Sequence, residues 1–422
     1  MKNYLTDDTK VILLLCGVLG KDKTVKPLAL NDYNKLVRWL RENEFRPADL
    51  LDPSNVIAAA IGSGLEQGRL QGLMARGVQL GFTIEEWQRN GVWLLSRGDR
   101  AYPRRLKKHL SDKSPALLFG VGEQSLLRGG GVGIVGSRDV DEAGRKFTQQ
   151  VAEQCVRSDI PVVSGGARGV DQISMNTALD AGGVTIGVLA ENLLKKSLER
   201  NARKAIADGQ LLLISPYHPS ARFSVGTAMG RNKLIYAMAD YGLVVSADYK
   251  KGGTWAGAKE ELKRKHHIPV FVRGGSDVPL GNTKLMDLGA EVWPKIIDTN
   301  KMCQILEKVG SSIKKEVRQS GELNLLYEFK DKSSLALEIA EDSSVLVIKE
   351  VVSSTNFSPA EELYQVVLPI LLKHLGTPII PDELAKILDV SKTQLNRWLK
   401  RAVESEKISK MNKPVRYCIV GK

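Results

Sequence analysis

The sequence is poor in cysteine. Its 422 residues include four cysteines that lie far apart, namely Cys16, Cys155, Cys303 and Cys418. None belongs to a C-x-x-C pair, and no histidine stands near them at the spacing of a zinc ligand. The pattern indicates neither a disulfide framework nor a zinc site. We therefore expect a protein of a reducing compartment, the cytoplasm, that holds no metal ion.

Long hydrophobic runs are also missing. The most apolar stretch near the N-terminus is KVILLLCGVLG, Lys10–Gly20, which is too short to span a bilayer. It follows Asp7 and Asp8, and it lacks the basic flank and the small-residue cleavage site of a signal peptide. The stretch predicts a buried helix, and we expect no membrane partner.

The usual catalytic motifs are absent as well. The sequence has no Ser/His/Asp arrangement, no H-E-x-x-H and no G-x-x-x-x-G-K-[ST]. Four histidines are more typical of surface or core positions than of metal or catalytic ligands, namely His218, His266, His267 and His374. We predict a binding protein rather than an enzyme, with no catalytic residue and no cofactor.

Positive charge, by contrast, is in excess. Lys and Arg number 61 and Asp and Glu 48, which gives a formal net charge of +13. Such an excess favours a polyanionic partner. An ordinary basic soluble protein has the same composition, so charge alone does not decide between the two.

The distribution of apolar residues divides the chain into four parts. Residues 1–92 have apolar positions at helical spacing and predict a small helical domain. Residues 93–298 contain a lead-in and then apolar runs that alternate with helical segments; the runs are GIVG, IPVVSGG, VTIGVLA, QLLLISP, YGLVVSA and IPVFV. These runs predict an α/β, Rossmann-like fold, with a mostly parallel sheet and helices on both faces. Residues 299–360 predict a connecting segment, and residues 361–422 a winged-helix-like domain.

The first of these strands contains GVGIVG, which satisfies the G-x-G-x-x-G spacing of a dinucleotide-binding turn. Its glycines flank the apolar residues of the strand itself instead of forming the turn after it. No acidic residue ends the next strand at the place for a ribose hydroxyl, because IPVVSGG ends in serine and glycine. A nicotinamide or flavin cofactor is therefore not expected. The turn is Gly136-Ser137-Arg138, followed by a helix over about 141–156.

Small residues and basic side chains recur where the chain enters or leaves these strands. Ligands of open α/β sheets bind at the carboxyl edge, so such segments meet in one crevice. Backbone amides, hydroxyls and the guanidinium fork suit a phosphate group. The sequence thus predicts a phosphate cradle made of four segments. Its residues are Gly136, Ser137 and Arg138; Ser164, Gly165, Gly166 and Arg168; Arg231, Asn232 and Lys233; and Gly252, Gly253 and Thr254.

The order of these motifs resembles the DNA-processing protein A family, also called Smf. The segments that carry the resemblance are WLLSRGDRAYPRRLKKHLSDKSPALLFGVGEQSLL, GIVGSR, SGGARGVDQISMNTAL, GGVTIGVLAENL, GRNKLIYAMADYGLVVSA, GGTWAGAKEELKRKHHIPVFV and GNTKLMDLGA. The resemblance implies a Rossmann-like domain that binds single-stranded DNA in a basic pocket and forms a homodimer. It also implies DNA transfer to a RecA-type recombinase, in recombination, transformation or a response to foreign DNA. Ser137 and Arg138 are implied as phosphate contacts.

Other functions fit parts of the same sequence. KGGTWAGAKEEL weakly resembles the P-G-G-x-G-T-x-x-E loop of phosphoribohydrolases, with Glu260 later than expected, so a nucleotide sensor or such an enzyme is one alternative. A winged-helix transcription regulator is another, with a recognition helix over 391–403. The side chains expected to project from that helix are Gln394, Asn396, Arg397 and Lys400. Trp255 is a candidate stacking platform for bases, but packing against the sheet is the preferred role.

Overall fold

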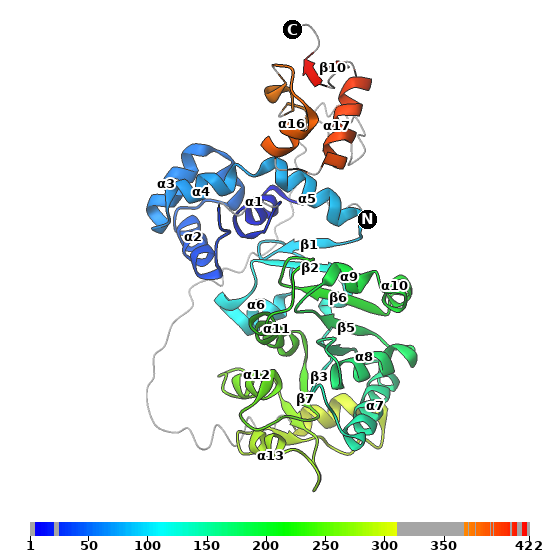
Figure 1. Cartoon of the computed structure of the whole chain (residues 1–422). Coiled ribbons are helices and arrows are strands. Elements are labelled where there is room, and N and C mark those ends of the chain that lie inside the picture. Colours follow the sequence, from blue (N-terminus) through cyan, green and yellow to red (C-terminus); the bar gives the residue numbers. More distant parts are fainter. Residues whose placement is uncertain are drawn as a thin grey trace, which may run out of the picture.

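The computed structural model describes residues 5–20, 25–309, 367–369, 371–375, 377–388, 390, 392–405, 407–411 and 416–419. In Figure 1 the chain runs from a blue helical part, through a cyan to yellow sheet region, to an orange and red C-terminal part. Of the predicted connecting segment, residues 310–360 lie outside the described residues.

Helices make up the N-terminal part, as predicted. They are α1 (Asp7–Cys16), α2 (Leu30–Glu42), the 3-10 helix η1 (Pro47–Leu51), α3 (Pro53–Ser63), α4 (Gln67–Met74) and α5 (Gly77–Arg89). The apolar run at the N-terminus forms α1, in which Val11, Leu13 and Leu15 are fully buried. The prediction of a buried helix is therefore confirmed. None of the described helices is long and apolar enough to cross a membrane.

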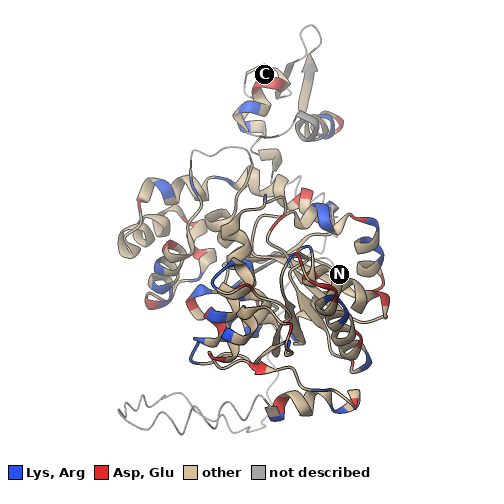
Figure 2. Ribbon diagram, turned by 60° about the horizontal axis from the view of Figure 1, so that its bottom comes forward, with Lys and Arg blue, Asp and Glu red and all other residues tan. Residues whose placement is uncertain are grey.

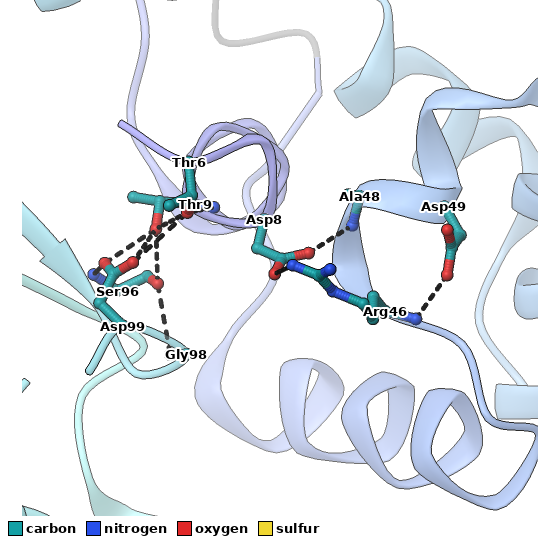
Figure 3. Close-up of polar contacts among 9 residues, drawn as sticks. All are labelled: Thr6, Asp8, Thr9, Arg46, Ala48, Asp49, Ser96, Gly98 and Asp99. Carbon is teal, nitrogen blue, oxygen red and sulfur yellow. Dashed lines mark hydrogen bonds and ion pairs between the residues drawn. The ribbon is translucent and has the colours of Figure 1, made fainter. Parts of the chain in front are cut away.

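Polar contacts fix α1 to the start of the sheet region (Figure 3). The Thr9 hydroxyl lies 2.8 Å from Ser96 Oγ and donates to the Asp99 carboxylate at 2.8 Å. Asp99 also accepts a hydrogen bond of 2.6 Å from Ser96 N. Asp8, beside Thr9 in the helix, accepts from Ala48 N at 2.9 Å. The helix is thus bonded to η1, to the last residue of β1 and to the turn that follows this strand.

Nine strands within the described residues form one sheet, in the order β1-β2-β6-β5-β4-β3-β7-β8-β9. They are β1 (Trp93–Ser96), β2 (Leu117–Val121), β3 (Val132–Val135), β4 (Val162–Ser164), β5 (Thr185–Val188), β6 (Leu211–Ser215), β7 (Tyr241–Val244), β8 (Val270–Val272) and β9 (Glu291–Val292). All neighbours from β6 to β9 are parallel, whereas β1 and β2 are antiparallel additions. The six predicted runs are all strands, so the α/β prediction is confirmed.

Helices cover both faces of this sheet (Figure 1). They are α6 (Arg104–Leu110), α7 (Glu142–Arg157), α8 (Val170–Asp180), α9 (Leu193–Ser197), α10 (Arg200–Ala207), α11 (Val225–Met238), α12 (Gly252–Leu262) and α13 (Leu280–Met286), with the 3-10 helices η2 (Ser111–Lys113), η3 (Gln124–Arg128) and η4 (Thr299–Lys301). Val151 of α7 packs with Ile134 in one core, and Ile235 of α11 packs with Val163 in another. Each core therefore joins one layer of helices to the sheet.

The chain changes direction beside β3. It leaves β3 through α7 and builds β4, β5 and β6 on one side, and it then returns through α11 to β7 on the other side of β3. Such a reversal is a topological switch point, at which the loops after two adjacent strands diverge and leave a crevice. The crevice expected from the sequence therefore has a definite place, at the carboxyl ends of β3 and β7.

The described C-terminal residues contain the elements expected of a winged helix. They are α16 (Pro381–Ile387), α17 (Lys392–Glu404), β10 (Ile408–Met411) and β11 (Arg416–Ile419), and the two strands pair antiparallel. These helices lie beside α5 in Figure 1. Phe82 of α5 packs edge-on against Trp398, with 6.2 Å between ring centroids. The side chains of Gln394 and Arg397, expected to project from the second helix, lie outside the described residues.

Candidate functional site

A pocket of about 420 Å³ opens at the carboxyl ends of β3 and β7. It lies at the switch point, where ligands of open α/β sheets bind. Most of the predicted cradle residues line it, namely Gly136, Ser137, Arg138, Arg231, Asn232, Gly252, Gly253 and Thr254. The structure thus brings all four predicted segments to the pocket. The turn after β3, the middle of α11 and the first turn of α12 line it through predicted residues, whereas the turn after β4 lines it through Ala167 and Asp171.

Hydrogen bonds between these segments hold the pocket walls together. Each is 3.0 Å long; they run from Ser137 N to Ser246 Oγ, from Thr254 Oγ1 to Gly136 O, and from Asn232 Nδ2 to Gly253 O. They connect the turn after β3 with the end of β7 and with α12, and α12 with α11. The pocket is therefore preorganised, which lowers the entropy cost of binding a ligand there.

The helices α7 and α12 both open at predicted cradle segments, and the one of these two whose N-terminus offers amide groups to the pocket is α12. The sequence predicts that the helix after Gly136-Ser137-Arg138 points its N-terminus at the ligand. Asp141 instead caps that helix, α7, because its carboxylate accepts a hydrogen bond of 2.5 Å from Gly144 N and pairs with Arg273. The first turn of α12 lines the pocket, and its N-cap residue, Lys251, makes no side-chain cap. An uncapped helix N-terminus attracts anions.

Arg231 and Asp171 form a buried ion pair in the pocket wall. The Arg231 Nη1 lies 3.3 Å from Asp171 Oδ2, and Arg231 is only 6% exposed. A side chain at Gly165 would collide with the guanidinium, since a Cβ there would lie 1.1 Å from Nη1. Burial raises the pKa of Asp171, while the positive charge of Arg231 opposes that rise. Gly165 is thus present to make room for this pair and does not line the pocket.

The other predicted residues lie elsewhere. Ser164 is buried, and its hydroxyl donates a hydrogen bond of 2.6 Å to Ile134 O. Gly166 occupies the left-handed region, at φ +66°. Arg168 is exposed and pairs with Asp139 at an adjacent hollow. Lys233 comes two residues after Arg231 on α11 and therefore faces away; its Nζ lies 2.9 Å from Glu260 Oε1.

The pocket also contains residues that sequence reasoning missed. They include Asp171, Phe223, Val225, Met229, Ser246, Asp248 and Lys251. Lys251 precedes the predicted GGT turn directly, so its position was open to prediction. Phe223 was not, because it stands in a loop without any repeating pattern. Trp255, the aromatic residue singled out from the sequence, is buried and packs edge-on against Tyr249, which confirms its preferred role in packing.

The charge of the pocket is mixed but offers cations to a ligand. Arg138 and Lys251 are exposed at its wall, and Asp248 is an exposed acid beside them. Arg231 is already paired with Asp171. Figure 2 shows Lys and Arg spread over many elements with Asp and Glu interspersed. The excess of positive charge thus belongs to the whole surface, and the pocket contributes a small number of well-placed donors.

The chemical groups of the pocket suit anion binding better than acid-base catalysis. Its buried carboxylate, Asp171, is occupied by Arg231. A phosphoribohydrolase would need the glutamate of its loop in the pocket. Glu260, the candidate for that residue, instead pairs with Lys233 and Arg264 and does not line the pocket. In the part of the chain that the structure describes, no three His, Cys, Asp or Glu side chains are grouped as a metal site.

Comparison with known proteins decides the family. The family model described as DNA recombination-mediator protein A matches residues 93–305, from β1 to just past η4. The chain belongs to this family. The match includes the sheet, the helices on both of its faces and every residue of the pocket described above, so the pocket is part of the domain that defines the family.

Relatives of the family are similar over the same region. Protein Smf of Synechocystis is 30% identical over 228 residues, which are 49% of this chain and 56% of that protein. The DNA processing protein DprA of Bacillus subtilis is 27% identical over 217 residues, 50% of this chain and 71% of that protein. The X-ray structure of DprA from Streptococcus pneumoniae shares the fold, with a TM-score of 0.55, 23% identity and coverage of 68% of this chain and 95% of that one.

Proposed function

We propose that this protein binds single-stranded DNA in the pocket between β3 and β7 and changes no covalent bond in it. The observation that carries the proposal is the meeting of an uncapped helix N-terminus, that of α12, with the Ser137-Arg138 turn at the switch point. A phosphate group suits amide, hydroxyl and guanidinium donors in this arrangement. Ser137 and Arg138 would contact the backbone of the strand, and Lys251 would add a second exposed cation.

Membership of the family extends this proposal to a process. The family is described as a mediator of DNA recombination, and relatives are named DNA processing proteins. We propose that the protein assists a RecA-type recombinase in recombination, in transformation or in a response to foreign DNA. The chain spans 56% of the length of the Synechocystis relative, so the role in recombination is a proposal for this chain and is not taken over from that protein.

We further propose that the protein acts as a homodimer that forms through the Rossmann-like domain. Four exposed apolar residues occur in the last segment of that domain, between Leu280 and Ile297, and this segment contains the edge strand β9. Apolar residues around an unpaired edge strand favour association with another chain. The dimer would carry two cradles, and two cradles on one strand bind with greater avidity than one.

The test of DNA binding compares two arginine variants of equal charge. Arg138→Ala removes the exposed guanidinium at the pocket, and Arg157→Ala removes one from the last turn of α7, at the opposite edge of the sheet. We expect Arg138→Ala to weaken binding of a labelled single-stranded oligonucleotide about tenfold. The slope of log affinity against log salt should also fall by about 0.7, the value for one phosphate contact to a single strand. Arg157→Ala should leave both quantities close to those of the wild type.

Three results would contradict the proposal. One is a wild-type protein that binds no oligonucleotide, or binds it with an affinity indifferent to salt. Another is an equal effect of both variants, which would assign binding to the general positive charge. The third is binding or hydrolysis of a free nucleotide alone, which would favour the nucleotide sensor or the phosphoribohydrolase.

A further inference from the structure

An exposed aromatic ring lies at the rim of the pocket. Phe223 precedes α11, and 45% of its surface is exposed. Val225 and Met229, one helical turn apart at the start of α11, are also exposed and line the same pocket. Three large apolar side chains thus form one strip next to the phosphate cradle. A contiguous apolar strip left open to water commonly marks a binding site.

The local structure holds this ring in place. Ser224 caps α11: its Oγ accepts a hydrogen bond of 3.0 Å from Thr227 N, and its own N–H donates to Thr227 Oγ1 at 3.1 Å. The capping box fixes the backbone directly after Phe223. The guanidinium carbon of Arg138 lies 5.2 Å from the centroid of the Phe223 ring, within range of a cation-π contact. The turn after β3 and the start of α11 therefore meet through this ring.

We propose that Phe223 is the surface on which a base of the bound strand stacks. The inference rests on the proposed function, because it takes the same strand to be the ligand. A nucleotide joins a phosphate to a flat, weakly polar ring, and the pocket places phosphate donors beside an exposed aromatic ring. Arg138 belongs to both parts, since it lines the cradle and covers part of the Phe223 ring. Val225 and Met229 extend the apolar surface for the neighbouring sugar or base.

If a base stacks on Phe223, this residue favours the binding of single-stranded over double-stranded DNA. Bases of a duplex are stacked on one another and paired, so they have no free face for the ring unless the duplex opens. Bases of a single strand are free to stack on a protein side chain, and every base has such a face. The ring should therefore favour single over double strands, with little preference among base sequences.

The experiment uses the full chain and two matched oligonucleotides. One is a short oligothymidylate, and the other has the same length and phosphates but abasic sites in place of the bases. We expect the wild type to bind the oligothymidylate on the order of tenfold more tightly than the abasic oligomer. Phe223→Ala should bind both with the lower affinity, and Phe223→Trp should restore the difference. Ile61→Ala, a change at an apolar residue of α3 that is 73% exposed, should behave as the wild type.

Duplex binding and the remaining outcomes separate this inference from the proposed function. Phe223→Ala should leave the affinity for a duplex unchanged, so the preference for single strands should shrink. If Phe223→Ala keeps the wild-type discrimination between the two oligomers, or if the wild type binds both equally, the stacking role is wrong and DNA binding stands. If no variant and no wild-type protein binds either oligomer, the proposed function fails, and the stacking role fails with it.

Discussion

At the scale of single residues, the pair of Arg231 and Asp171 makes the sharpest prediction. Both side chains are more than nine-tenths buried, and removal of one leaves the other charge buried without compensation. We expect Asp171→Ala to lower the free energy of unfolding by about 3–5 kcal/mol. Urea denaturation of the purified variant measures this change. The double variant, Asp171→Ala with Arg231→Ala, should lose clearly less than the sum of the single losses. Strict additivity would show that the pair has no coupling.

The same pair shows how far single residues were predictable. Arg231 was expected in the cradle because a basic side chain stands before a strand of a parallel sheet. Its partner was not expected, because an ion pair between residues 60 positions apart leaves no periodic signal in the sequence. The role of Gly165 follows from the same contact, because a side chain at this position would collide with the Arg231 guanidinium. Lys233 was placed in the cradle by proximity in sequence, and helical geometry turns it away.

At the scale of elements, the N-terminus of α7 gives a prediction with a defined pH dependence. Asp141 caps this helix, and the hydrogen bond from Gly144 N holds the pKa of its carboxyl below the ordinary value. Asp141→Ala should cost about 1 kcal/mol of stability near neutral pH, as loss of an N-cap usually does. Because the pKa is lower in the folded state, the carboxylate stabilises the fold above its unfolded pKa of about 3.9. That contribution disappears as the pH falls through the lower, folded value.

The control for this cap is Asp141→Asn, which keeps an oxygen that accepts from Gly144 N. Denaturation at about pH 7 should rank the wild type first, Asp141→Asn second and Asp141→Ala last. The difference between the wild type and Asp141→Asn should shrink as the pH falls below about 3.9 and disappear once the pH is below the folded pKa of Asp141, because both caps are then neutral. A constant difference across this range would disprove the link between the cap and its ionisation.

Elements were predicted well wherever an apolar run is bounded by glycine or polar residues. The six central strands and α7, which was expected over 141–156 and extends over Glu142–Arg157, follow from that pattern. Strands β1 and β2 were not predicted, because they lie in a lead-in whose apolar runs are short and separated by a basic helix, α6. The N-terminus of α12, and not that of α7, is free to donate amide hydrogen bonds, because Asp141 already caps α7. The spacing of residues in the sequence does not specify the side-chain contacts of Asp141.

At the scale of the whole molecule, net charge proved a weak guide to the site. The formal charge of +13 favoured a polyanionic partner, yet the basic side chains are spread among acidic ones (Figure 2). The location of the site follows from topology, which brings residues from β3, α11 and α12 to one edge. Fold class was predictable because it depends on patterns that repeat along the chain. The homodimer was implied by the family resemblance, and the structure adds only the exposed apolar residues proposed as its interface.

The assembly prediction follows from these exposed residues. Leu280, Leu288, Val292 and Ile297, in the segment that contains β9, are all exposed, and Ile297 is 84% exposed. We expect sedimentation at micromolar concentration to give twice the 46.3 kDa mass of one chain. Ile297→Glu should produce a monomer, because a charge buried in an apolar contact is costly, and its thermal stability should otherwise be unchanged. Ile61→Glu, at a residue of similar exposure in α3, should remain a dimer. A wild type that sediments as a strict monomer, or an Ile297→Glu variant that stays dimeric, would rule out this surface as the interface.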